Sequence, residues 1–214
     1  GSSLGDITTR AQADGEDEYG ARYRIIGNKM WISGGDQDAS ENIVHLVLAK
    51  AALPGDPLPG GAKGISLFIV PKILPDGSRN DIALAGLNHK MGNRGTTNCL
   101  LNFGEAGGAI GWRVGEEGQG LAQMFMMMNE ARIGVGMGAA VLGYRGYRQS
   151  VAYAKDRRQG RRLGSAEKAS IPIIEHADVR RMLLQQKAYS EIAIAICLFC
   201  SHLQGQKTEE SESL

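Results

Sequence analysis

The stretch Tyr23–Gly35, YRIIGNKMWISGG, decides the fold of the first half of the chain. Apolar and polar residues alternate on both sides of the pair Gly27 and Asn28, which tolerates positive φ angles. This pattern predicts a β-hairpin whose arms are Tyr23–Ile26 and Lys29–Ser33. The first half of the chain is therefore expected to be built from β-strands.

The second arm of this hairpin carries a large aromatic side chain and a hydroxyl group. Trp31 and Ser33 are two residues apart, so they lie on the same face of the strand. Gly34 and Gly35 follow and allow another group to approach the backbone closely. A flat, partly apolar ligand fits such a ledge, whereas a Trp packed into a barrel core explains the same pattern.

Further strand-like runs lie on either side of turn-rich segments such as LPGDPLPGGAKG at 53–64 and LPDGSRND at 74–81. Several short strands with long Gly- and Pro-containing loops favour an antiparallel barrel or sandwich for residues 1–105. The runs are Ile43–Ala49, Ile65–Val70, Ile82–Leu87 and Asn98–Phe103.

The period of the apolar residues changes after a glycine-rich stretch at 106–120, which we expect to be a linker. Residues 121–156 have helical spacing and good helix formers, and a second helix is predicted from about Glu175 to Leu203. Residues 205–214 are polar and expected to be frayed. The fold class is thus α+β and multidomain: an antiparallel β-barrel or sandwich, then long antiparallel helices of an incomplete bundle within 121–204. Two helices cannot close a core, so further helices must cover them.

Composition narrows the class of function. The 214 residues are 43% apolar and carry a net charge of +1, which argues against a nucleic-acid or membrane surface spread over the whole molecule. We find no apolar run of the ~20 uncharged residues that a membrane span needs, and no signal peptide. The start of the chain is expected to be a cut end.

The cysteines and histidines give no catalytic or metal pattern. Three cysteines form no even disulfide framework, which suits a reducing compartment. Cys197 and Cys200 form a CxxC at helical spacing, and we expect buried thiols rather than a zinc or redox site. No chemistry is assigned to the four histidines, which are His45, His89, His176 and His202.

Two polar groups stand out in the helical half. Asn129, Glu130 and Arg132 lie among methionines, so Arg132 is expected either to pair with a carboxylate or to hold an anionic ligand. Basic residues from Lys155 to Arg162 follow the long helix; they either face solvent or bind phosphate. The glycines of GVGMG, 134–138, lie inside a helical period without a preceding strand, which indicates helix packing and not a dinucleotide site.

In this order, the motifs resemble those of the acyl-CoA dehydrogenases over roughly residues 1–203. GSSLGDITTRA is similar to the family's G-S-D-L-G-x-x-x-T-x-A, and YRIIGNKMWISGG to its Y-x-I-N-G-x-K-x-W-I-T-N-G. HKMGNRGTTNCLLNF and GEEGQGL resemble the close of its middle β-domain, and residues 129–163 the first helix of its C-terminal domain. The forms WISGG, EARIG and EHADVRRMLLQQKAYSE resemble a bacterial branch that includes 3-methylmercaptopropionyl-CoA dehydrogenase.

The resemblance implies an FAD enzyme that removes two hydrogens from Cα and Cβ of an acyl-CoA thioester. In the family a Glu takes the α-proton and the β-hydride passes to flavin N5. Trp31, Ile32 and Ser33 match cofactor-binding positions, with Ser33 in place of the usual Thr. Arg157 matches an arginine that reaches the FAD pyrophosphate of a neighbouring subunit, although the following loop lacks the Phe of R-x-x-F-G.

For the substrate, the resemblance implies that Ser2 contacts the acyl chain and that Asn129 and Arg132 approach the CoA portion. No catalytic base is expected in this chain. Most of the family places its Glu late in the C-terminal domain, and a minority places it directly before the arginine that Arg132 matches, which here is Ala131. Glu130 lies ~100° round the helix and is not expected to replace it.

We therefore expect a fragment of an acyl-CoA dehydrogenase, inactive alone and weak in FAD binding. The family implies electron-transfer flavoprotein or a similar acceptor as a partner, a homo-oligomer (a dimer or tetramer), and a bacterial cytoplasm. Two alternatives stay open. One is an acyl-CoA oxidase, and the other is a non-catalytic binding protein that contacts nucleic acid through residues 157–162.

Overall fold

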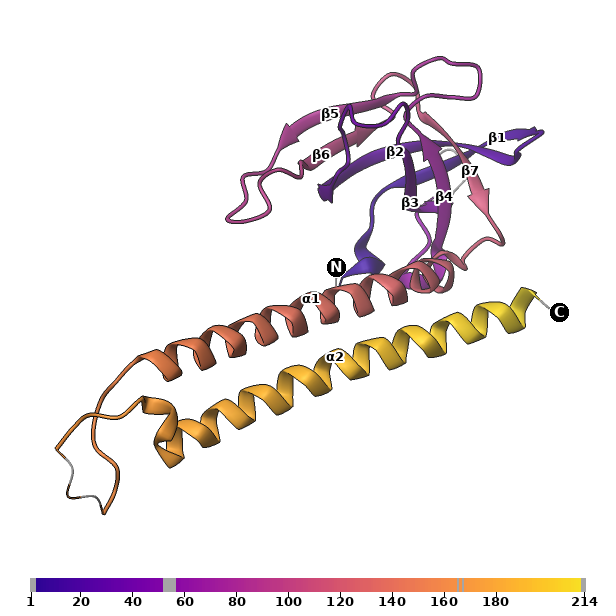
Figure 1. Ribbon diagram of the computed structural model, residues 1–214. Helices are drawn as coiled ribbons and strands as arrows, with labels where there is room; N and C mark the ends of the chain where they lie inside the picture. Colours follow the sequence, from indigo (N-terminus) through magenta and orange to yellow (C-terminus); the bar gives the residue numbers. More distant parts are fainter. Residues whose placement is uncertain (1–2, 52–56, 165, 167, 213–214) are drawn as a thin grey trace. The chain divides into compact units, whose positions relative to one another are not determined.

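The computed structural model of the protein describes residues 3–51, 57–164, 166 and 168–212 (Figure 1). It separates into two compact units, residues 1–126 and 127–214, and the boundary lies inside a long helix. The first unit holds the strands, and the second holds most of two long helices, as the α+β fold class predicts. The strands are β1 (Arg10–Asp17), β2 (Gly20–Ser33), β3 (Val44–Ala51), β4 (Ile65–Pro71), β5 (Ile82–Leu87), β6 (Asn98–Phe103) and β7 (Ala109–Val114). The α-helices are α1 (Gly120–Asp156) and α2 (Ala177–Glu212), and the 3-10 turns are η1 (Leu4–Asp6), η2 (Ala62–Gly64) and η3 (Ile173–Glu175).

The strands form one sheet that closes on itself. Their order is β1-β3-β4-β7-β2-β6-β5, and β1 also pairs with β2. This additional pairing joins β1, β3, β4, β7 and β2 into a ring, and β6 and β5 extend the sheet from β2. Every pairing is antiparallel except that of β1 with β3, so the sheet is mixed. The predicted barrel is confirmed, with this one parallel pair as a correction.

The predicted hairpin at Gly27 is wrong, because β2 runs unbroken through it. β2 pairs with β1 up to Ile26 and with β6 from Gly27 onward. Gly27 has a φ of +146°, and a Cβ there would lie 2.9 Å from Cα of Thr9. The glycine therefore permits a close backbone approach at the point where β2 changes partners, instead of a turn.

Alternate residues of the strands fill the core of the first unit. Tyr23 and Ile25 of β2 point inward, where Tyr23 packs edge-on against Phe68 with ring centroids 5.0 Å apart. Between them, Arg24 pairs with Asp14 of β1 at 3.1 Å. This alternation places the ionic side chains on the surface and the apolar ones inside.

Two strands, β1 and β7, were not predicted from the sequence. β1 is poor in β-branched and aromatic residues, and β7 lies within 106–120, the stretch expected to be a linker. Trp112 of β7 is 8% exposed and donates its indole N–H to Asp17 of β1 at 2.8 Å. Contacts between distant parts of the chain stabilise both strands, and local propensity does not reveal them.

The two long helices are close to the predicted ones. Residues 205–212, expected to be a frayed tail, continue α2, since Gln, Lys and Glu are good helix formers. A Cβ at Gly136 would lie 3.4 Å from Sγ of Cys197, and one at Gly143 would lie 3.9 Å from Cβ of Ser190. Rising numbers on α1 meet falling numbers on α2, so the helices are antiparallel.

Most large apolar side chains of this helix pair are exposed. Leu142 is 70% exposed on α1, and Tyr189 is 73% exposed on α2. Cys197 is half-buried and Cys200 is exposed, so the expected burial of these thiols is not found within this chain. The exposed apolar faces agree with the expectation that two helices cannot form a core alone.

One helical segment among the described residues, 177–206, is long and apolar enough to cross a membrane by length and composition alone. Charged residues such as Asp178 and Arg181 interrupt this segment, so it is not the uncharged run of ~20 residues considered in the sequence analysis. Core helices of helical bundles meet the same criterion, and this segment contains the ion pair Lys187–Glu191.

Candidate functional site

A β-bulge in β2 exposes the aromatic ledge that the sequence predicts. The register between β2 and β6 shifts between Lys29 and Ile32, so Met30 and Trp31 share one position of the ladder. Both side chains are exposed, Trp31 by 64%, whereas Ile32 packs against the core. The alternative that Trp31 belongs to the barrel core is therefore wrong. Simple alternation did not predict the exposure of Met30.

The backbone of Trp31 is strained. Its φ is +64°, and among the described residues only Asn93 is another non-glycine residue with positive φ. Such a conformation costs about 1–3 kcal/mol and persists only when the surroundings hold it in place. Here Ile32 anchors the strand in the core, and N–H of Gly34 bonds to the carbonyl of Thr97 at 2.9 Å. A strained, exposed aromatic residue indicates a role in binding.

The hydroxyl of Ser33 has a buried neighbour that orients it. Asn98 is 9% exposed, and its amide nitrogen lies 3.5 Å from Oγ of Ser33. The amide oxygen of Asn98 accepts from Asn88 at 2.9 Å, which fixes the direction of the Asn98 amide. Oγ therefore acts as the acceptor in this contact, and its O–H is left to donate to a ligand. The sequence analysis did not identify Asn98 as a supporting residue.

Exposed leucines also occur on β5, which lies on the other side of β6 from β2. β5 also shifts register next to β6, between Leu84 and Gly86, and Gly86 pairs with Leu100. Leu84 and Leu87 of β5 are 42% and 62% exposed. The bulges of β2 and β5 therefore both lie beside Leu100 of β6. They increase the local twist beside Trp31.

Charged side chains lie near Asp36, in the segment that follows β2. Asp36 forms an ion pair with Lys72, whose hydrogen bond lowers the pKa of that carboxyl. The hydroxyl of Thr97 donates to the carbonyl of Asp36 at 2.8 Å. Burial lowers the pKa of His45, whose Nε2 has no hydrogen-bond partner among the described residues. These contacts hold the segment that follows Ser33.

Lys29, just before the bulge, gives a pH-dependent prediction. Its Nζ donates to the carbonyl of Leu48 at 2.7 Å, and burial lowers its pKa from 10.5 to about 8. Between these two values the unfolded chain binds more protons than the folded chain, so the free energy of unfolding rises with pH. Lys29→Met removes this titrating amino group, and with it the pH dependence that it causes. We expect urea unfolding from pH 7 to 10 to show a gain in stability for the wild type relative to Lys29→Met above pH 8; parallel curves would contradict the prediction.

The predicted substrate residues Asn129 and Arg132 meet on α1, where Nη1 of Arg132 donates to Oδ1 of Asn129 at 3.3 Å. Ser2, the third predicted substrate residue, lies outside the described residues. Arg157 follows the end of α1 and donates to Oε1 of Gln159 at 3.3 Å. Between Arg132 and Arg157 the helix rises by roughly 37 Å. These two arginines therefore cannot contact the same end of one ligand.

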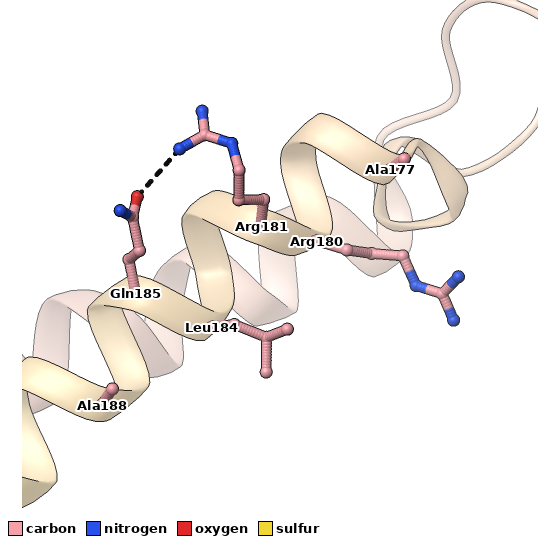
Figure 2. Close-up of a pocket in the computed structure, with 6 residues that line it drawn as sticks. All are labelled: Ala177, Arg180, Arg181, Leu184, Gln185 and Ala188. Atoms are coloured by element: carbon pink, nitrogen blue, oxygen red, sulfur yellow. Dashed lines mark hydrogen bonds between the residues drawn. The ribbon is translucent and has the colours of Figure 1, made fainter.

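A surface hollow on α2 lies away from all of these residues. It has a volume of about 600 Å³ and is lined by α2 alone, from Ala177 to Ala188. Figure 2 shows Arg181 turned along the helix toward Gln185, to which it donates at 3.1 Å. Arg181 also pairs with Asp178, so we assign no ligand to this surface. Among the described residues, no three His, Cys, Asp or Glu side chains gather as a metal site.

Known proteins resemble this chain in sequence and in fold. No protein-family model matches the chain. The chain is 40% identical over 181 residues to 3-methylmercaptopropionyl-CoA dehydrogenase of Ruegeria pomeroyi, a match covering 82% of this chain and 30% of that protein. It is 39% identical over 221 residues to a butyryl-CoA dehydrogenase of Syntrophomonas wolfei, covering 99% of this chain and 35% of that protein.

The fold is also found in solved structures. Caenorhabditis elegans ACDH-11, solved in complex with C11-CoA, superposes with a TM-score of 0.69 at 23% identity, covering 94% of this chain and 31% of that one. The chain thus spans about a third of the length of the relatives that it matches. Over that third, sequence and fold agree with the same group of enzymes, and the chain belongs to the acyl-CoA dehydrogenase family.

Proposed function

We propose that this chain is the part of an FAD-dependent acyl-CoA dehydrogenase that carries the flavin ledge and the CoA-facing helix. The reaction removes one hydrogen each from Cα and Cβ of an acyl-CoA thioester. The observation that carries the proposal is Trp31, a strained and exposed aromatic residue beside the hydroxyl of Ser33. Relatives at about 40% identity are named for this activity.

The described residues fit a flavin ring. Trp31 offers a flat apolar face, and Ser33 offers a hydroxyl that can donate a hydrogen bond. When bound, the flavin supplies an acceptor for the hydride from Cβ. Trp31 then covers the ring and excludes water, Ile32 anchors the strand, and Asn98 holds the Ser33 hydroxyl in place.

We assign Asn129 and Arg132 to the CoA portion of the substrate, and Ser2 to its acyl chain. Arg157 is assigned, from the family resemblance, to the FAD pyrophosphate of a neighbouring subunit, and the length of α1 separates it from Arg132. The catalytic base is assigned to a Glu outside this chain, since Ala131 precedes Arg132 and Glu130 lies on another face of the helix.

The exposed helix faces support a larger assembly. Residues such as Leu142 and Tyr189 need apolar partners, and we propose that further helices and a second subunit supply them in a homo-oligomer. Electron-transfer flavoprotein or a similar acceptor is the proposed partner, and the bacterial cytoplasm the proposed location.

The nucleic-acid alternative has less support. In the loop after α1, the guanidinium of Arg158 bonds to the carbonyl of Ser170, and Arg162 pairs with Glu175. A strand-binding surface needs several cations directed at phosphates, whereas these two have partners within the loop. No feature of the chain favours the oxidase alternative over dehydrogenation.

Arg132 tests the proposed CoA contact. Arg132→Gln removes a charge that interacts with substrate in both the ground state and the transition state. We therefore expect KM for acyl-CoA to rise about 10-fold or more with little change in kcat. Steady-state kinetics of the complete protein with a dye acceptor measures both. Arg145→Gln, further along α1, is a matched control. An unchanged KM for Arg132→Gln would remove this residue from the site.

A further inference from the structure

The loop between α1 and α2 presents Arg157 on a framework of backbone hydrogen bonds. N–H of Ile173 donates to the carbonyl of Arg157 at 2.8 Å, and N–H of Gln159 donates to Ile171 at 2.9 Å. N–H of Ile171 donates to the carbonyl of Gly160 at 3.2 Å. Residues 157–160 are therefore not a free coil, although they lie beyond the end of the helix.

His176, the residue before α2, is wedged against this segment. A ring nitrogen of His176, Nε2, lies 2.8 Å from the carbonyl oxygen of Gln159. A carbonyl only accepts, so Nε2 must carry the hydrogen. Gly160 has a φ of +76°, and a Cβ there would be 3.1 Å from Cε1 and Nε2 of the ring. The carbonyl of His176 accepts from Arg180 at 3.0 Å, which fixes the histidine to the first turn of α2.

Gln159 links His176 to the guanidinium of Arg157. The backbone carbonyl of Gln159 accepts from His176, and the side-chain Oε1 of Gln159 accepts from Nη2 of Arg157 at 3.3 Å. An arginine has five N–H donors, so this bond leaves donors for a ligand. Arg157 is exposed, whereas its neighbours Arg158 and Arg162 have partners in the loop.

We propose that His176 is a positioning residue that holds Gln159, and through it Arg157, in the orientation that binds a diphosphate. The inference rests on the proposed function, in which that diphosphate belongs to FAD. Immobilising an arginine on binding costs free energy, and a loop that is already ordered avoids part of that cost. His176 is one of the four histidines to which the sequence analysis assigned no chemistry.

The test is a double-mutant cycle in the complete protein, with FAD affinity measured by flavin fluorescence. We expect His176→Leu and Arg157→Ala each to weaken FAD binding about 10-fold, and the double variant to bind no more weakly than Arg157→Ala alone. His176→Gln places a donor near the position of Nε2 and should restore binding to within about 3-fold of wild type. Glu175→Gln, which breaks the adjacent pair with Arg162, is the control and should bind FAD as the wild type does.

A role confined to general stability predicts other results. Under the proposal, by contrast, only cofactor binding is affected. At saturating FAD, kcat of His176→Leu should therefore equal that of the wild type. Losses that multiply in the double variant, or wild-type affinity in His176→Leu, would overturn the inference and leave the proposed function standing. A wild-type protein that binds no FAD would overturn the proposed function itself.

Discussion

Replacing Trp31 by alanine should weaken FAD binding about 10- to 100-fold, because stacking of a flat ring on an aromatic side chain contributes about 1–3 kcal/mol. Trp31→Phe keeps a flat ring at the same position and should lose much less. Flavin fluorescence during titration of the apoprotein of each variant measures the effect. Equal affinity in wild type and Trp31→Ala would show that the exposed indole does not contact the cofactor.

A glycine at this position separates ligand binding from backbone strain. Trp31→Gly removes the same ring, but glycine adopts a φ of +64° without the strain of other residues. We expect Trp31→Gly to bind FAD as weakly as Trp31→Ala and to unfold with a free energy at least as high. A less stable Trp31→Gly would mean that the bulge is not strained.

Replacing Gly27 by alanine should lower the free energy of unfolding of the first unit, residues 1–126, by about 3 kcal/mol or more. Its φ of +146° is nearly exclusive to glycine, and a Cβ would lie 2.9 Å from Cα of Thr9, a backbone atom that cannot move aside alone. Urea unfolding followed by tryptophan fluorescence reports on this unit, which contains both tryptophans, Trp31 and Trp112.

Gly86→Ala is the matched control for this substitution. Gly86 is also a strand glycine, but nothing lies within 4 Å of a Cβ built there. It should change the unfolding free energy by less than about 1 kcal/mol. If Gly27→Ala were as stable as Gly86→Ala, the change of strand partners at Gly27 would not depend on glycine.

The sequence predicted those elements whose residues show a clear period. The start of α1 differs by one residue from the prediction, and β4, β5 and β6 match to within one residue. β1 was missed because it is poor in β-branched and aromatic residues, and β7 because it lies in a glycine-rich stretch; both depend on contacts such as the bond from Trp112 to Asp17. Gly27 was interpreted as a turn because Gly-Asn is a turn pair, whereas the close approach of Thr9 determines its conformation.

The candidate site was predicted by residue type more than by geometry. The pair of Trp31 and Ser33 was visible in the sequence, but the bulge that exposes Trp31 depends on its pairing with β6. Asn98 and His176 could not be found from local patterns, because each acts on a residue distant in sequence. The assignments of Arg132 and Arg157 come from the family resemblance and stay predictions.

The central claim is tested most directly by the visible spectrum of the complete protein during anaerobic addition of acyl-CoA thioesters. We predict a flavin absorbance band in the purified protein that bleaches with at least one of a series of short, branched and methylthio-substituted acyl-CoAs. Bleaching would show that electrons pass from the thioester to the bound flavin. A protein without flavin, or a flavin that no acyl-CoA reduces, would contradict the proposed dehydrogenase function.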